Sequence, residues 1–230
     1  CEEKHGRGSY RCRSTETGRI ETVHMKMRSL FLLVFVFGYS GIRAQNYDIR
    51  LLRSVNSRQT PSGITAFKAI SNSVYIVPCV IPVGQFAFGK YKKDDALCYR
   101  SFATGVNLGI TGLLSYAVKL GTDRARPYVT YPDIKYDKPS STPSFPSGHT
   151  SLAFCMATSM AVQGEKWYYV VPAYAWACSV AYSRMYLGKH YPSDVLGGII
   201  LGAGIPVLFH YCKPLQNGVH NVGIKLHLYH

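Results

Sequence analysis

Three short groups of polar residues in this sequence could together bind and transfer a phosphate. In chain order they read Lys119-x6-Arg126-Pro127, Pro146-Ser147-Gly148-His149 and Ser183-Arg184-x5-His190-x3-Asp194. Each group alone is weak, because a lysine near an Arg-Pro pair, a Pro-Ser-Gly-His turn or a histidine four residues before an aspartate is common. Their combination in one chain is what indicates a single site.

Five of these residues are suited to holding a phosphate. Lys119, Arg126 and Arg184 offer three cations to one small anion, and a guanidinium can bind a phosphate through two parallel hydrogen bonds. Ser147 adds a hydroxyl donor. Gly148 lets backbone N–H groups approach closely at an expected helix start, where the helix dipole also favours negative charge.

The remaining three residues are suited to the reaction itself. A neutral His190 can attack phosphorus, while Asp194 is placed to hold the other ring nitrogen and to stabilise the charge that develops. His149 is then free to protonate the leaving oxygen as general acid. Phosphoryl transfer requires positioning and charge neutralisation, so we expect neither a metal nor another cofactor, because three cations supply the charge.

The elements that must position these residues are apolar and helical. Apolar stretches cover residues 64–89, 101–121, 149–163 with 167–182 as a hairpin pair, and 194–211. Gly197, Gly198, Gly202 and Gly204 resemble the small-residue seams that let membrane helices approach closely. We therefore predict an all-α integral membrane bundle of about five spans. A soluble all-α domain is the alternative, because two of the stretches are short and contain Ser, Thr and Tyr.

Charge predicts how this bundle is oriented. The turn expected at 90–100 contains Lys90, Lys92, Lys93 and Arg100, and short loops rich in Lys and Arg tend to stay cytoplasmic. All three polar groups then fall on the outer face, where charged residues at helix ends around one cavity are functional candidates. We expect a bacterial inner-membrane protein whose site faces the periplasm.

The N-terminal residues have the pattern of an export signal. Residues 1–24 are polar and are interpreted as a non-native or upstream extension, and 25–44 as a signal peptide with Lys26 and Arg28 before an apolar run. That run is too short to span a bilayer as a helix, although an uncleaved anchor is the alternative. Residues 45–63 follow as an amphipathic segment expected at the membrane interface.

Composition narrows the class of protein further. The 230 residues include 26 Lys+Arg against 12 Asp+Glu, a formal charge of +14, yet only 17% are charged and 47% are apolar. The high apolar fraction excludes general disorder, because a disordered chain has low hydrophobicity. An average globular chain is about 25% charged, so this chain has few charges for its length. Its excess of Lys and Arg favours basic edges that contact an anionic membrane surface. A nucleic-acid role has no motif behind it. The seven cysteines show neither a disulfide framework nor metal-ligand spacing.

At this point the chain resembles the type 2 phosphatidic acid phosphatase (PAP2) superfamily, whose signature is K-x6-RP, PSGH and SR-x5-H-x3-D. Every signature position is filled, and the resemblance spans roughly residues 65–211. It implies an all-helical PAP2/haloperoxidase-like core and a phosphohistidine at His190, oriented by Asp194, with acid–base work by His149. Phosphate binding is implied for Lys119, Arg126, Ser147, Gly148 and Arg184.

Within that superfamily we expect the bacterial membrane lipid phosphatase branch, with a catalytic domain over 64–212 and a loosely structured tail over 213–230. The expected substrate is a membrane lipid phosphate or diphosphate. Lipid A phosphate or undecaprenyl diphosphate is favoured over phosphatidylglycerol phosphate or phosphatidate. A soluble periplasmic acid phosphatase, a vanadium-dependent haloperoxidase and a non-catalytic lipid-binding protein are the alternatives. The loop 128–147 is expected to shape the pocket, with Lys135 and Lys138 as extra anion contacts, or to be an ordinary exposed connection.

Overall fold

The computed structural model describes residues 41–229, and this part of the chain folds into helices joined by loops, without strands. The predicted extension 1–24 and most of the predicted signal peptide 25–44 lie outside the described residues. The chain divides between Tyr47 and Asp48 into two units, and the description below concerns Asp48–His230. The elements are α2 (Gly41–Asn56), α3 (Pro61–Asn72), the 3-10 turn η1 (Ser73–Tyr75), α4 (Val77–Lys92), α5 (Asp95–Thr122), α6 (Pro127–Thr130), α7 (Gly148–Val162), α8 (Trp167–Tyr186), α9 (Pro192–Tyr211) and α10 (Lys213–Lys225).

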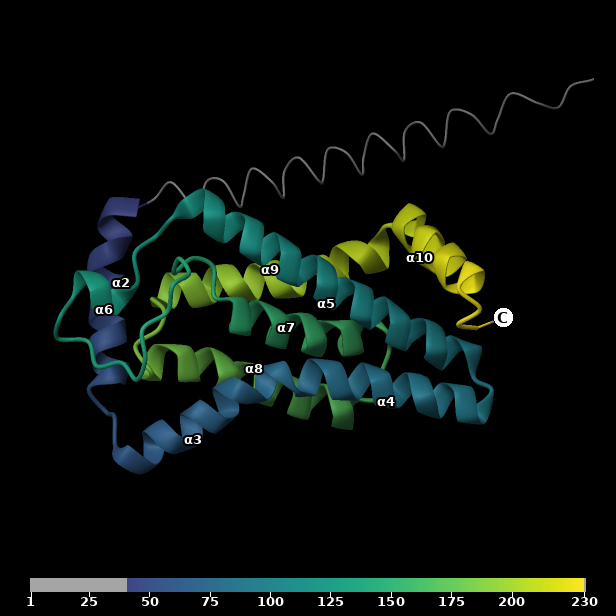
Figure 1. The fold of residues 1–230 in the computed structure, drawn as a ribbon, viewed down its shortest axis with the longest axis horizontal. Helices are drawn as coiled ribbons and strands as arrows, with labels where there is room; N and C mark the ends of the chain where they lie inside the picture. The colour runs from purple at the N-terminus through teal and green to yellow at the C-terminus, as the bar shows by residue number, and fades with distance from the viewer. Residues whose placement is uncertain (1–40, 230) are drawn as a thin grey trace, which may run out of the picture. The chain divides into compact units, whose positions relative to one another are not determined.

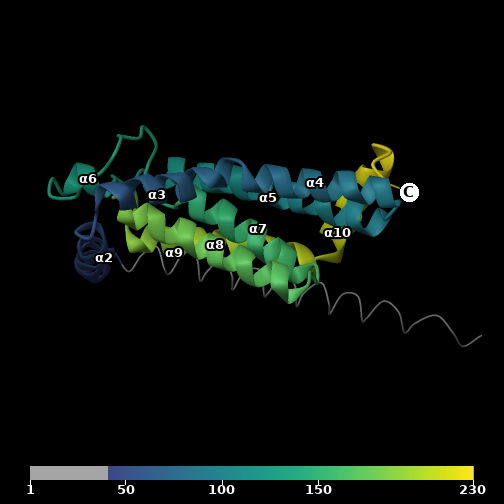
Figure 2. The same ribbon diagram turned by 90° about the horizontal axis from the view of Figure 1, so that it is seen from below.

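Helix α7 is the centre of this bundle. It packs against α9, α8 and α5, while α4 packs against α5 and α3 against α8 (Figure 1). Figure 2 shows α3, α4 and α5 as one layer and α7, α8 and α9 as the other. The cluster of buried apolar residues lies between these helices, with Ala153, Ala157 and Val180 fully enclosed. The predicted all-α fold is confirmed.

The outer surfaces of the bundle are apolar. Two helical segments, Asp95–Thr130 and Pro192–Tyr211, are long and apolar enough to cross a membrane. The pair Pro61–Tyr75 and Val77–Lys92 qualifies as a third span if it is taken as one bent unit. Within the apolar 18-residue window of each segment only 39% and 33% is buried in the protein, so most of this surface needs an apolar surrounding. The five predicted helical stretches are all present, and membrane crossing by α7 and α8 stays a prediction.

The first predicted stretch, 64–89, is not one helix. It is divided into α3 and α4, which meet at η1 with a bend of 45°. Pro78 stands at the start of α4. Because proline has no N–H for the carbonyl four residues earlier, a continuous helix would lose a hydrogen bond at this position and would clash. The break turns α3 toward the polar end of the bundle, where it lines the site described below.

The second predicted stretch begins earlier than expected. Helix α5 starts at Asp95, and Asp94 caps it by accepting a hydrogen bond from the Leu97 N–H at 3.0 Å. The turn predicted over 90–100 is therefore reduced to Lys93 and Asp94, and Arg100 lies within α5. Lys93 takes the left-handed conformation, φ 57°, that ends α4. The buried face of α5 is polar and small, with Ser101, Thr104, Asn107, Thr111, Ser115 and Lys119.

Two of the four predicted seam glycines account for the close approach of α9 to α7. A Cβ atom at Gly198 would lie 2.7 Å from the Ser147 carbonyl oxygen, and one at Gly202 would collide with that of Ser151. Gly197 instead faces the Phe145 ring. Gly204 has open space around it, so its assignment to the seam was wrong.

The segments on both sides of the predicted domain 64–212 pack more closely on it than expected. In α2, Ile49 and Leu52 are buried in a cluster with Ile134 and Tyr191, so this apolar face packs on protein. Contact of α2 with a membrane surface stays a prediction. The tail 213–230, predicted to be loosely structured, instead forms α10 up to Lys225.

We predict that Gly202→Ala destabilises the protein by about 1–3 kcal/mol, because the added methyl group must push α9 away from α7. The measurement is the thermal unfolding midpoint of the purified protein in detergent. Gly204→Ala is the matched control, since no atom lies within 4 Å of its Cβ position. It should leave the midpoint unchanged or raise it slightly, because alanine favours a helix by about 0.5–1 kcal/mol. Equal midpoints for both variants would contradict the close approach at Gly202.

Candidate active site

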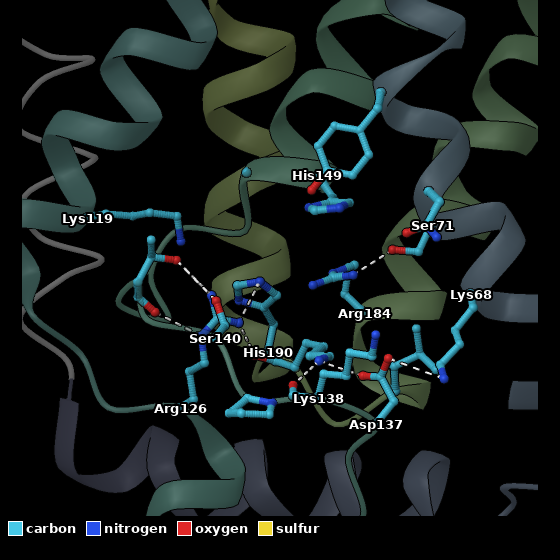
Figure 3. Close-up of a pocket in the computed structure, with 17 residues that line it drawn as sticks. Lys68, Ser71, Lys119, Arg126, Asp137, Lys138, Ser140, His149, Arg184 and His190 are labelled. Carbon is cyan, nitrogen blue, oxygen red and sulfur yellow. Dashed lines mark hydrogen bonds and ion pairs between the residues drawn. The ribbon is translucent and has the colours of Figure 1, made fainter.

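The three polar groups meet at one end of the bundle. Lys119 lies in the last turns of α5, His149 in the first turn of α7, Arg184 near the end of α8, and His190 just before α9. They line one cavity of about 590 Å³. Figure 3 shows Lys119 and Arg126 on one side of His190, with His149 and Arg184 on the other.

His190 is held between an aspartate and a guanidinium. Its Nδ1 lies 3.6 Å from Asp194 Oδ2, while its Nε2 faces Arg126 Nη1 at 3.5 Å. The ring is 2% exposed. Burial, together with the charges of Arg184 and Arg126, lowers the pKa of His190 to about 3, although Asp194 acts in the opposite direction. The imidazole is therefore neutral at pH 7, which is the nucleophilic form.

Asp194 has more partners than His190 alone. Its carboxylate is fully buried and accepts hydrogen bonds from Ser144 Oγ at 2.5 Å, from Arg124 Nη1 at 2.5 Å and from the Tyr191 N–H at 2.9 Å. A buried carboxylate stays ionised only when such donors replace water. Arg124 and Ser144 were missed in the sequence, because neither belongs to the three motifs.

Arg124 links this carboxylate to α2. Its Nη2 donates to Asp48 Oδ2 at 2.9 Å, and its guanidinium lies 4.2 Å from the centre of the Tyr191 ring. Asp48 also accepts from the Ser193 N–H at 2.8 Å and from the Ser193 hydroxyl. The segment predicted as a separate interfacial element therefore contacts the surroundings of Asp194.

The two cations on the other side of His190 are bound to loop carbonyls. Lys119 Nζ donates to the carbonyl oxygen of Pro143 at 2.8 Å. Arg126 donates from Nε to Thr142 O and from Nη1 to Lys189 O, both at 2.9 Å. The segment between α6 and α7 is thereby tied to the site by the cations themselves.

Arg184 reaches the cavity from the opposite wall. Its Nη1 donates to Ser71 Oγ of α3 at 2.5 Å, while its Nε is buried without a partner in the described structure. His149 stands near it and packs edge-on against Tyr75, with ring centres 5.1 Å apart. Ser71 and Tyr75 were missed because neither belongs to the three motifs and both lie in a stretch that was interpreted only as a membrane span.

Two predicted phosphate-binding residues lie differently from the cations. Gly148 lines the cavity at the start of α7, and a Cβ there would meet only Ser115 Oγ at 3.6 Å and Lys119 Cε at 4.0 Å. Ser147 is fully buried behind the cavity wall, where its hydroxyl pairs with Thr150 Oγ1 at 2.9 Å. Direct contact of Ser147 with a phosphate stays a prediction.

The loop 128–147 contributes to the cavity unevenly. Asp137, Lys138, Pro139, Ser140 and Thr142 line it. Lys135 does not, since its backbone is bound by Asn56 and its side chain is exposed. Among residues 41–229, no cluster of three or more His, Cys, Asp or Glu side chains is arranged to hold a metal ion.

We predict that Arg124→Met lowers kcat for a phosphate ester on the order of 10–100-fold and changes KM little, because Asp194 loses one of its buried donors. Arg124→Lys should restore part of the rate. Arg53→Met is the control, because Arg53 forms only an exposed ion pair with Asp133. Exposed ion pairs contribute about 0–1 kcal/mol to folding stability. Wild-type kcat in folded Arg124→Met would exclude a positioning role.

Comparison with known proteins identifies relatives of this chain. The chain is 26% identical over 184 residues to an undecaprenyl-diphosphatase of Sulfolobus acidocaldarius, an alignment spanning 78% of this chain and 84% of that protein. It is 30% identical over 162 residues to phosphatidylglycerophosphatase B of Bacillus subtilis, spanning 66% and 73%.

A solved structure supports the same fold. The transmembrane PAP2-type phosphatidylglycerolphosphate phosphatase from Bacillus subtilis superposes with a TM-score of 0.65 at 22% identity, covering 84% of this chain and 94% of that one. This match shows the fold, and the long apolar helical segments support a membrane protein. The family model of the PAP2 superfamily matches residues 100–217, and the chain belongs to that superfamily.

Proposed function

We propose that this protein is a metal-independent phosphatase that removes phosphate from a membrane lipid phosphate or diphosphate through a phosphohistidine intermediate. The observation that carries the proposal is the convergence of Lys119, Arg126 and Arg184 on the neutral, buried His190 in one cavity. Cations and a nucleophile in this arrangement supply charge neutralisation and in-line attack, which phosphoryl transfer requires.

In the first half of the reaction, His190 Nε2 attacks phosphorus and the bond from phosphorus to the leaving oxygen breaks. Asp194 Oδ2 stabilises the positive charge that develops on the imidazole through Nδ1. The bound substrate phosphate brings negative charge beside His149 and favours its protonated form, and His149 then gives this proton to the leaving oxygen. In the second half, His149 takes a proton from water, the water oxygen attacks the phosphohistidine, and orthophosphate leaves with His190 neutral again.

A lipid substrate is favoured by the apolar surface beside the cavity. Tyr75 lines the cavity and is 64% exposed, and Ile76 and Val80 continue an exposed apolar surface along the start of α4. A phosphate held by the cations would thus leave its attached chain next to a surface that faces lipid. Soluble phosphate esters would gain nothing from these contacts.

The proposed setting is the bacterial inner membrane with the site on the periplasmic face. The cavity lies at one end of the bundle, while Lys90, Lys92 and Lys93 lie at the opposite end, where α4 turns into α5. Positive residues in a short turn favour the cytoplasm. Within this proposal the catalytic domain covers 64–212, an anionic membrane surface is its partner, and lipid A phosphate and undecaprenyl diphosphate are the favoured substrates.

We expect the purified protein in detergent to release phosphate from lipid phosphates faster than from nucleotides or sugar phosphates at equal concentration. The reason is the added binding energy of the lipid chain on the apolar surface beside Tyr75. Phosphate release across a panel of lipid A phosphate, undecaprenyl diphosphate, phosphatidylglycerol phosphate and phosphatidate would rank the substrates. A higher kcat/KM for a soluble ester would contradict the lipid assignment and favour an acid phosphatase.

The two histidines should be separable by their response to the leaving group. His190→Ala should abolish turnover and the labelled phosphoenzyme, because no other group in the cavity replaces the nucleophile. His149→Ala should slow alkyl esters by about 10²–10⁴-fold, and nitrophenyl phosphate much less in its phosphorylation step, since that oxygen leaves without a proton. Rapid quench with labelled substrate measures both. An acid-labile phosphoenzyme in His190→Ala would overturn the assignment.

A further inference from the structure

The cavity contains more positive charge than one phosphate requires. Besides Lys119, Arg126 and Arg184, it is lined by three lysines, Lys68, Lys138 and Lys189. Asp137 is the one carboxylate among the residues that line it. Like charges in a shared cavity repel one another, so a second group of cations there needs a second anion.

Two of the extra lysines hold one carboxylate between them. Asp137 Oδ1 lies 2.5 Å from Lys189 Nζ, and Oδ2 lies 3.5 Å from Lys68 Nζ. Figure 3 shows Asp137 and Lys68 on the same side of the cavity, below Arg184. The two carboxylate oxygens thus face two ammonium groups from separate elements, α3 and the loop before α9. Two oxygens of a phosphate could make the same two contacts.

Lys189 is the better enclosed of the pair. It is 8% exposed, and its Nζ also donates to the carbonyl oxygen of Lys138. Burial and the nearby charges of Arg184 and Arg126 lower the pKa of Lys189, while Asp137 opposes this. The pKa of Asp137 lies below its usual value. Burial alone would raise this pKa, but the hydrogen bond and the positive charge of the Lys189 ammonium lower it more strongly. An anion at this position therefore stabilises the charged lysine.

This lysine pair is continuous with the reaction centre. Lys189 precedes His190 directly, and its carbonyl oxygen is fixed by Arg126 Nη1 at 2.9 Å. Asp137, in contrast, comes from the loop between α6 and α7 and carries no further side-chain partner among the described residues than the two lysines. A loop carboxylate that contacts two lysines of the cavity can be exchanged for a substrate anion without rearrangement of a helix.

We propose that Lys68 and Lys189 form a second phosphate subsite, occupied by Asp137 in this structure, and that the preferred substrate is a lipid diphosphate. This inference rests on the proposed function and narrows its substrate class. The terminal phosphate lies among Lys119, Arg126 and Arg184, and the phosphate attached to the lipid lies between the lysine pair.

The chemical step assigns each group a task. His190 Nε2 forms a bond to the terminal phosphorus, and the bond between that phosphorus and the bridging oxygen breaks. The electron pair stays on the bridging oxygen, so the leaving group is a lipid monophosphate whose added negative charge faces Lys68 and Lys189. Water then hydrolyses the phosphohistidine and releases orthophosphate. Because a phosphate is a weaker base than an alkoxide, this leaving group depends less on the proton of His149.

Inhibition by inorganic anions tests the subsite without a lipid. The full chain in detergent should be inhibited at least about tenfold more strongly by pyrophosphate than by orthophosphate, since two phosphates use both sets of cations. Lys68→Met should remove most of this difference and leave inhibition by orthophosphate unchanged. Lys166→Met, which removes one exposed charge at the other end of the bundle, is the control and should behave as wild type.

Asp137→Asn separates the subsite from a purely structural ion pair. If Asp137 competes with the second phosphate, its loss should strengthen pyrophosphate inhibition and lower KM for a lipid diphosphate several-fold, with no change for a lipid monophosphate. If the ion pair only holds the loop, the variant should lose activity on both lipids equally, which would overturn the inference.

The two proposals fail in different ways. Equal kcat/KM for lipid monophosphate and diphosphate, with pyrophosphate no better than orthophosphate as inhibitor, would overturn the subsite and leave the lipid phosphatase intact. Turnover of nitrophenyl phosphate without turnover of any lipid phosphate would overturn the proposed lipid function itself.

Discussion

Repulsion among the cations around His190 is the constraint on which the rest of this site depends. Lysines and arginines that converge on one partly buried cavity must each find acceptors before any substrate arrives. The backbone supplies most of these acceptors. Lys119 donates to the carbonyl oxygen of Pro143, and Lys189 donates to that of Lys138. Arg126 donates to the carbonyl oxygens of Thr142 and Lys189. Carbonyl oxygens carry only partial charge, so they satisfy the hydrogen bonds while leaving the cavity strongly positive for an anion.

This arrangement makes the loop between α6 and α7 part of the site. The sequence left open whether this loop shapes the pocket or is an ordinary exposed connection. In the structure its carbonyl groups accept hydrogen bonds from Lys119 and Arg126, and its Ser144 hydroxyl donates to Asp194. A phosphate that enters the cavity competes with these contacts. The position of the loop and the occupancy of the cavity are therefore coupled through the same cations, because one ammonium or guanidinium group cannot fully serve both acceptors.

The sequence predicted the centre of the site well and its surroundings poorly. His190 and Asp194 are four residues apart, so their proximity follows from chain connectivity, and the helix ends that carry Lys119, His149 and Arg184 follow from the apolar stretches. Arg124 and Asp48 are 76 residues apart, and nothing local indicates that they meet. The same is true of Lys68, which reached the cavity only because Pro78 breaks the first stretch and turns α3 toward the site.

Length and hydropathy together identify the segments that contain α5 and α9 as spans, but not α7 or α8. Helix α7 has 15 residues, fewer than a span needs, and its packing shows what surrounds it instead. Helix α7 is surrounded by protein, and its buried residues include Thr150, Ser151, Thr158 and Ser159. Their hydroxyl groups find partners inside the bundle, such as Ser147 O for Ser151 and Tyr174 for Thr158. Only the helices on the outside of the bundle need an apolar surface that suits lipid. The central helix α7 instead carries small side chains, which let Gly198 and Gly202 of α9 approach it closely. This close packing holds α9, and therefore Asp194, against the start of α7.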